Sequence, residues 1–177
     1  AKEYLQPISK LPASHTEGKE VIDIIGNCFT NLPITTDEYI NRPELENELT
    51  NVLKEEDRLP IITLLGKGGI GKTSLAIKVI QDIAKTKRFD LIIWFSARDI
   101  DLLPDGPKLV QTKVLDQKDI ANEYCQLLFP EQSGKENIQF FSNQLSKNSF
   151  GKALYVFDNF ETVTNPIEIF EWLNTYI

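Results

Sequence analysis

The residues best suited to chemistry form one glycine-rich segment, Gly66-Lys67-Gly68-Gly69-Ile70-Gly71-Lys72-Thr73. Glycine lets the backbone turn successive N–H groups inward, where they can surround the oxygens of a phosphate. Lys72 would add a mobile charge for the β- and γ-phosphates, and Thr73 a hydroxyl for Mg²⁺. The segment therefore predicts a P-loop that binds ATP or ADP together with Mg²⁺. The residues expected to line it are Gly66, Gly68, Gly69, Ile70, Gly71, Lys72, Thr73 and Ser74.

A carboxylate for the same metal ion is predicted at Asp158, which directly follows the apolar run 153–157. A strand-end aspartate is also a common turn or helix-capping residue, so both interpretations stay open. Glu161 is the nearest carboxylate that could activate a water for hydrolysis, with a solvated loop residue as the alternative. The predicted catalytic residues are Lys72, Asp158 and Glu161, and the predicted metal ligands are Thr73 and Asp158.

The segments around these residues alternate between apolar runs and amphipathic stretches. The runs 59–65, 91–95 and 153–157 have the unbroken apolar character of strands buried on both faces. Helical spacing of apolar residues predicts helices over about 43–53, 73–85, 116–130, 136–147 and 166–176. Turn-forming residues in 96–115 predict a loop or a small hairpin. The alternation favours an α/β fold, a three-layer P-loop NTPase with a mostly parallel sheet, incomplete at its C-terminus.

A change of composition near residue 38 indicates the domain organisation. Residues 1–38 are mostly polar, with one short apolar cluster at 21–25, and are predicted to be a linker or leader. Residues 39–177 are predicted to form the nucleotide-binding domain. The 177 residues include no methionine, even at position 1, so we expect a piece of a longer protein.

Composition argues against several classes of function. The formal net charge of −7 disfavours direct binding of nucleic acid, and no apolar run is long enough to span a membrane. His15 is the only histidine, which excludes a histidine-based triad and a His-rich zinc site. Cys28 and Cys125 form neither a metal-binding spacing nor a disulfide framework. These features favour a cytoplasmic protein.

Four passages in order along the chain resemble the STAND-type signal-transduction ATPases, which include the NB-ARC modules of plant resistance and apoptosis proteins. Residues 39–45 look like the family's short Phe-Val-Gly-Arg-x-x-x-Leu element, with Asn41 in place of the usual glycine. The P-loop has the family's Gly-Gly-Ile-Gly-Lys-Thr form, and residues 89–98 resemble its second strand with the pattern Trp-x-Ser. Residues 154–161 are similar to the Walker B variant of bacterial members. The resemblance implies that Ile40 and Arg42 lie beside the nucleotide.

The resemblance also implies a nucleotide-driven switch in immunity or anti-phage defence. ADP would hold the intact protein closed, and exchange for ATP would permit assembly with other copies of itself and activate an effector. An N-terminal effector and C-terminal sensor domains would lie outside this chain. We expect slow Mg²⁺-dependent ATP hydrolysis by the intact protein, and nucleotide binding with or without turnover by this segment. A metabolic P-loop kinase or a GTPase acting on a small substrate is the alternative.

Three further residues, Trp94, Phe95 and Arg98, lie in or just after the predicted second strand. Trp94 and Phe95 are predicted to be core residues, because they lie in an apolar strand. Arg98 follows that strand and has two open interpretations. It could face the γ-phosphate or a neighbouring subunit, or it could form an ordinary surface ion pair.

Overall fold

The structure is a computed structural model that describes residues 11–34, 39–55, 61–103, 106–132 and 136–176. Its elements are β1 (Asp23–Ile25), β2 (Cys28–Thr30), α1 (Pro43–Glu55), α2 (Lys72–Ala84), β3 (Leu91–Ser96), β4 (Ile100–Leu103), β5 (Gly106–Leu109), α3 (Gln117–Leu128), α4 (Asn137–Lys147), β6 (Ala153–Asp158), the short 3₁₀ helix η1 (Phe160–Thr162) and α5 (Pro166–Asn174). None of the described helices has the length and apolar character needed to cross a membrane.

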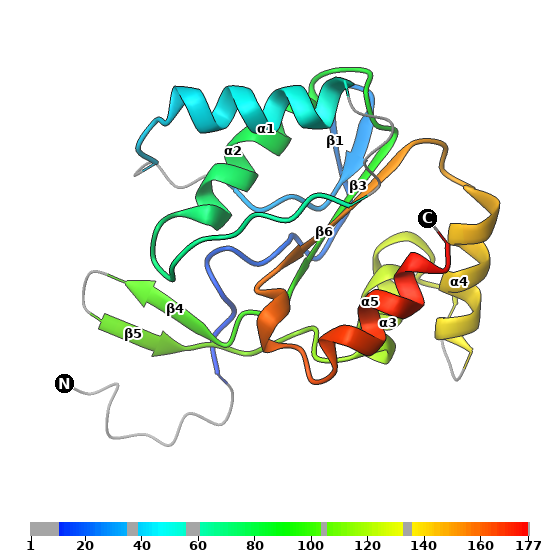
Figure 1. The fold of residues 1–177 in the computed structure, drawn as a ribbon. Helices are drawn as coiled ribbons and strands as arrows, with labels where there is room; N and C mark the ends of the chain where they lie inside the picture. The colour runs from blue at the N-terminus through cyan, green and yellow to red at the C-terminus, as the bar shows by residue number, and fades with distance from the viewer. Residues whose placement is uncertain (1–10, 35–38, 56–60, 104–105, 133–135, 177) are drawn as a thin grey trace.

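A four-stranded sheet with the strand order β1-β2-β3-β6 forms the centre of the molecule (Figure 1). β1 and β2 make an antiparallel hairpin, whereas β2 pairs with β3, and β3 with β6, in parallel. The register places Leu91 opposite Ala153 at one end of β3 and Ser96 opposite Asp158 at the other. Asp158 therefore lies at the carboxyl edge of the sheet, where ligands bind in open parallel sheets.

Helices cover both faces of this sheet (Figure 1). On one face α1 and α2 pack over Ile92 and Trp94 of β3, and on the other α3, α4 and α5 enclose Leu91, Ile93 and Phe95. Successive side chains of a strand point to opposite faces, so β3 contributes to both cores and is buried throughout. The predicted three-layer α/β architecture with mostly parallel strands is confirmed, as is the burial of Trp94 and Phe95.

The predicted strand over 59–65 is wrong for its described part, 61–65. These residues form no strand, and Leu65 is 89% exposed. A strand exists only where a neighbour completes its backbone hydrogen bonds, and among the described residues the sheet ends at β6. The same open edge leaves β6 half-buried along its length, where full burial was predicted. Residues 59 and 60 lie outside the described residues.

Part of the predicted leader is packed into the fold. The hairpin of β1 and β2 extends the sheet, and its turn contains Gly26 at a φ of 63°. Asn31, fully buried after β2, accepts a hydrogen bond from the Trp94 N–H at 2.7 Å and donates one to the Trp94 carbonyl at 3.0 Å. The domain boundary at residue 38 stays a prediction, and residues 1–10 and 35–38 lie outside the described residues.

The stretch 96–115 contains the small hairpin that was one of its two interpretations. β4 and β5 pair in antiparallel fashion, and this hairpin projects away from the main sheet (Figure 1). The following helix, α3, begins after Asp116, whose side chain accepts a hydrogen bond from the Asp119 N–H as an N-cap.

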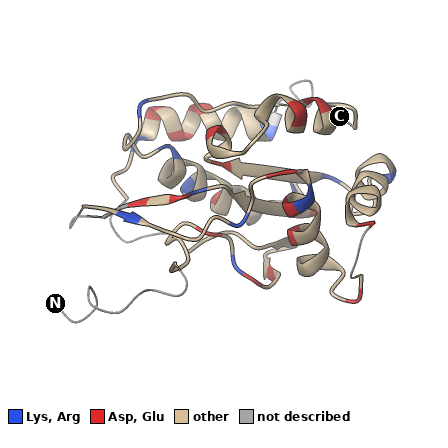
Figure 2. Ribbon diagram, turned by 90° about the horizontal axis from the view of Figure 1, so that it is seen from below, with Lys and Arg blue, Asp and Glu red and all other residues tan. Residues whose placement is uncertain are grey.

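Basic and acidic residues are interspersed over the described elements (Figure 2).

Candidate nucleotide-binding site

The glycine-rich loop turns directly into α2. Gly69 and Gly71 have φ values of 76° and 86°, in the left-handed region that other residues rarely adopt. The loop is exposed from Gly66 to Ile70, and its Ile70 N–H donates a long hydrogen bond to the Lys67 carbonyl at 3.4 Å. The Lys72 Nζ reaches back to donate a hydrogen bond to the Gly66 carbonyl at 2.9 Å. The ammonium group therefore already lies over the loop that is predicted to hold the phosphates.

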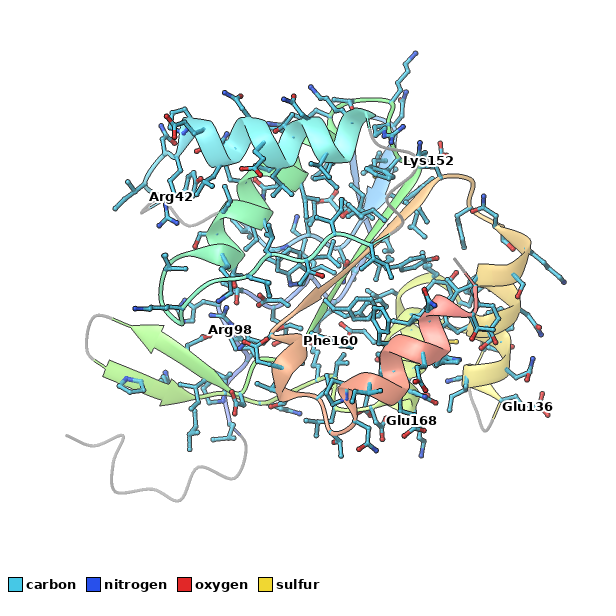
Figure 3. All side chains as sticks on the ribbon, in the orientation of Figure 1. Arg42, Arg98, Glu136, Lys152, Phe160 and Glu168 are labelled. Atoms are coloured by element: carbon cyan, nitrogen blue, oxygen red, sulfur yellow. The ribbon has the colours of Figure 1, made fainter. Side chains whose placement is uncertain are left out.

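Arg42 lies against this loop from the start of α1 (Figure 3). A Cβ added to Gly71 would be 3.0 Å from Arg42 Nη2, so the guanidinium lies in close contact with the loop and would have to shift by a few tenths of an ångström to admit one. The Arg42 N–H and the Tyr39 hydroxyl both donate to Glu46 Oε1, at 2.6 and 2.8 Å, which fixes the segment before α1. Ile40 is 76% exposed. The structure thus places Arg42 beside the P-loop, and the nucleotide contacts of Ile40 and Arg42 stay predictions.

The structure brings Thr73 of α2 and Asp158 of β6 into direct contact. The Thr73 hydroxyl donates a hydrogen bond to Asp158 Oδ1 at 2.7 Å. Ser74 follows Thr73 in the first turn of α2 and is partly buried. The contact depends on two elements that meet at one point, the N-terminus of α2 and the carboxyl end of β6. These are the two predicted metal ligands.

The environment of Asp158 fits a hard divalent cation. Its Oδ2 is buried and accepts no hydrogen bond of good geometry among the described residues, although Arg98 Nη2 lies 3.3 Å away as an ion-pair partner. Burial raises the pKa of Asp158, and the nearby charge of Glu161 adds to this, whereas the Arg98 guanidinium and the Thr73 hydroxyl lower it. Mg²⁺ in nucleotide sites binds through one or two carboxylates together with phosphate oxygens. Thr73 and Asp158 would hold Mg²⁺, which when bound would neutralise charge on the phosphates.

Arg98 lies in the middle of this site, at the end of the sheet where β6 leads into η1 (Figure 3). Its Nη2 donates to Thr73 Oγ1 at 2.7 Å and lies 3.3 Å from Asp158 Oδ2. Its Nη1 lies 3.7 Å from Asp101 Oδ1. Sequence reasoning left the role of Arg98 open and missed Asp101, because the contacts depend on how the chain turns after β3.

Glu161 lies in η1, three residues beyond Asp158, and is exposed. It is close enough for its charge to raise the pKa of Asp158. Exposure leaves the carboxylate free to meet a water, but no contact in the described structure assigns it that task. Its role as a catalytic base stays a prediction.

The α/β fold, the glycine-rich loop before α2 and the Thr73–Asp158 pair define a P-loop NTPase. Residues 43–128 match the model of the NB-ARC domain. This match confirms the predicted resemblance to the NB-ARC modules of STAND-type ATPases for residues 43–128.

Similar proteins come from plants, animals and bacteria. The chain is 31% identical over 74 residues to a protein of Solanum bulbocastanum named disease resistance protein RGA4, with 40% of this chain and 8% of the relative covered. It is 40% identical over 57 residues to mouse NACHT, LRR and PYD domains-containing protein 10, with 29% of this chain and 8% of the relative covered. An uncharacterized WD repeat-containing protein of Nostoc sp. is 32% identical over 134 residues, covering 71% and 9%.

The matched part of the chain spans less than a tenth of each of these three relatives. No solved structure matches the chain at the significance that the relatives reach.

Proposed function

We propose that this chain is the ATP- and ADP-binding switch module of an NLR-like signalling protein that acts in immunity or anti-phage defence. The observation that carries the proposal is the contact of Thr73 with Asp158 at the mouth of an exposed glycine-rich loop. That contact joins a predicted phosphate site to a predicted Mg²⁺ site in one place. The name of the plant relative, a disease resistance protein, supports the immune setting, and the NACHT and LRR domains in the name of the mouse relative support the NLR-like class.

In this proposal the chain's own residues divide the work of holding the nucleotide. Backbone N–H groups of the P-loop and Lys72 bind the phosphates, Thr73 and Asp158 hold Mg²⁺, and Arg42 lies beside the loop. Exchange of ADP for ATP would favour assembly with other copies and activation of an effector, in the cytoplasm. Hydrolysis would be slow and would reset the switch, with Glu161 as the base.

Titration of the protein with a fluorescent ADP analogue tests the proposal. The Lys72→Ala variant should bind at least about tenfold more weakly, since it loses charge-assisted hydrogen bonds to phosphate. The fold should persist, because within the described part of the chain the Lys72 side chain bonds to loop carbonyls alone. Lys118→Ala, an exposed lysine of α3 on the other face of the sheet, is the matched control. Equal affinity of the Lys72→Ala variant and the control would overturn the proposal. In the wild-type protein, competition of the analogue with ATP and with GTP measures the base specificity.

A further inference from the structure

Arg98 bridges two buried carboxylates, which face different nitrogens of its guanidinium. The side chains of Asp101 and Asp158 are only 4% and 8% exposed, and that of Arg98 is 16% exposed. One positive charge thus faces two negative charges, which leaves a formal net charge of −1 in a largely desolvated place. A further cation would neutralise this buried negative charge, and the carboxylate oxygens could serve as its ligands.

The guanidinium uses the same atoms that the predicted Mg²⁺ site requires. A threonine hydroxyl has one proton and two lone pairs. The Thr73 proton goes to Asp158 Oδ1, and one lone pair accepts from Arg98 Nη2. Asp158 Oδ2 forms an ion pair with the same nitrogen at 3.3 Å, without a hydrogen bond of good geometry among the described residues. Arg98 and Mg²⁺ therefore compete for one pair of oxygen ligands.

A second anchor for Arg98 is built into the N-terminal segment. Asp101 accepts a hydrogen bond from the Ser14 hydroxyl at 2.6 Å and another from the His15 backbone N–H at 2.8 Å. These two donors fix the Asp101 carboxylate independently of Arg98. The guanidinium can give up Thr73 and Asp158 and still keep a buried counter-charge at Asp101.

We propose that Arg98 is an internal competitor of Mg²⁺: it pairs with Thr73 and Asp158 and withdraws toward Asp101 when Mg²⁺ binds with the nucleotide. The inference rests on the proposed function, because it concerns the same nucleotide site. Its consequence is that the apparent affinity for Mg²⁺ equals the intrinsic affinity multiplied by the fraction of molecules in which Arg98 has withdrawn. Arg98 is then a positioning residue that determines how strongly nucleotide binding depends on Mg²⁺.

The test measures the dissociation constant of ADP in EDTA and in saturating Mg²⁺. The first constant divided by the second gives the ratio by which Mg²⁺ strengthens ADP binding. ADP is the probe because it has no γ-phosphate that could hold Arg98. Arg98→Met should raise this ratio by about tenfold, the equivalent of one charge-assisted contact no longer opposing the metal. Arg88→Met, which removes an arginine beyond the opposite end of α2, is the control and should leave the ratio unchanged.

A ratio for Arg98→Met within twofold of the wild-type value would overturn the inference and leave a purely structural ion pair. Failure of the proposed function looks different, because the wild-type protein would then bind no ADP under either condition. If the Arg98→Met variant does not fold, the wild-type protein carries the test through side-chain ¹⁵N NMR of its four arginines. The Arg98 Nε–H signal should stay in place with ADP and EDTA and shift when Mg²⁺ is added. A signal that Mg²⁺ leaves unmoved would overturn the inference.

Discussion

Asn31 offers a direct test of whether the N-terminal segment belongs to the folded domain. It follows β2, is completely buried, and bonds through its side-chain amide to both backbone groups of Trp94. The amide thus continues the pairing of β2 with β3 beyond the last strand residue of β2. Asn31→Ala would remove both hydrogen bonds and leave a buried N–H and a buried carbonyl of Trp94 without these partners.

The cost can be estimated from these two contacts. A hydrogen bond contributes about 1 kcal/mol net, and a buried group left unsatisfied costs about 1 to 3 kcal/mol. We therefore expect the free energy of unfolding to fall by about 2 to 4 kcal/mol, a large fraction of the 5 to 15 kcal/mol typical of a domain. The same substitution at Asn51, exposed on α1, should change it by less than about 0.5 kcal/mol.

Urea unfolding followed by circular dichroism measures both variants against the wild-type protein. A loss at Asn31 no greater than the loss at Asn51 would refute the reasoning. It would mean that the Asn31 contacts contribute nothing to stability, as expected of a simple leader. An unchanged slope with a lower midpoint would locate the effect in the native state.

Two further predictions concern α3 and use the same assay. Burial raises the pKa of Glu123 from 4.5 to about 7, so the folded state holds this proton more tightly and stability falls as pH rises between those values. Glu123→Gln should therefore be more stable than the wild-type protein at pH 8, by up to about 3 kcal/mol, and this difference in the free energy of unfolding should shrink toward pH 5. Glu131→Gln, an exposed control, should show no such trend. A difference at Glu123 that does not change with pH would contradict the reasoning. Asp116→Ala removes the N-cap of α3 and should cost about 1 kcal/mol, whereas Glu136→Ala at the start of α4, where the side chain makes no capping bond, should cost less; equal losses would argue against the cap.

The helix after the P-loop and the strand β3 could be predicted because their signals are local. The amphipathic pattern after Gly71 and the apolar run at 91–95 each determine an element within a few residues. Asp158 was found in the same way, as the polar residue that ends an apolar run. Its contact with Thr73 followed from parallel topology, since the carboxyl ends of parallel strands share one edge.

Strand pairing was less predictable, because an apolar run does not indicate which other strand will pair with it. The run 61–65 is as apolar as β3, yet it has no strand partner among the described residues and stays exposed. β2 has three residues in a polar setting, yet it pairs with β3 and is secured by the Asn31 side chain. Hydrophobicity indicates that a segment will be buried if a partner is present, whereas the sheet order depends on which edges meet.

The contacts of Arg98 with Asp101 and Asp158 could not be predicted from the sequence. Arg98 and Asp101 are three residues apart, a separation too short to suggest a buried pair in an extended chain. They meet because the chain leaves β3 and turns into the β4–β5 hairpin, and because Ser14 arrives from a segment 87 residues away to fix Asp101. An arginine at a strand end is ordinarily a solvated residue. Only the burial of both carboxylates makes this one a candidate regulator of metal binding, and burial is a property of the assembled fold.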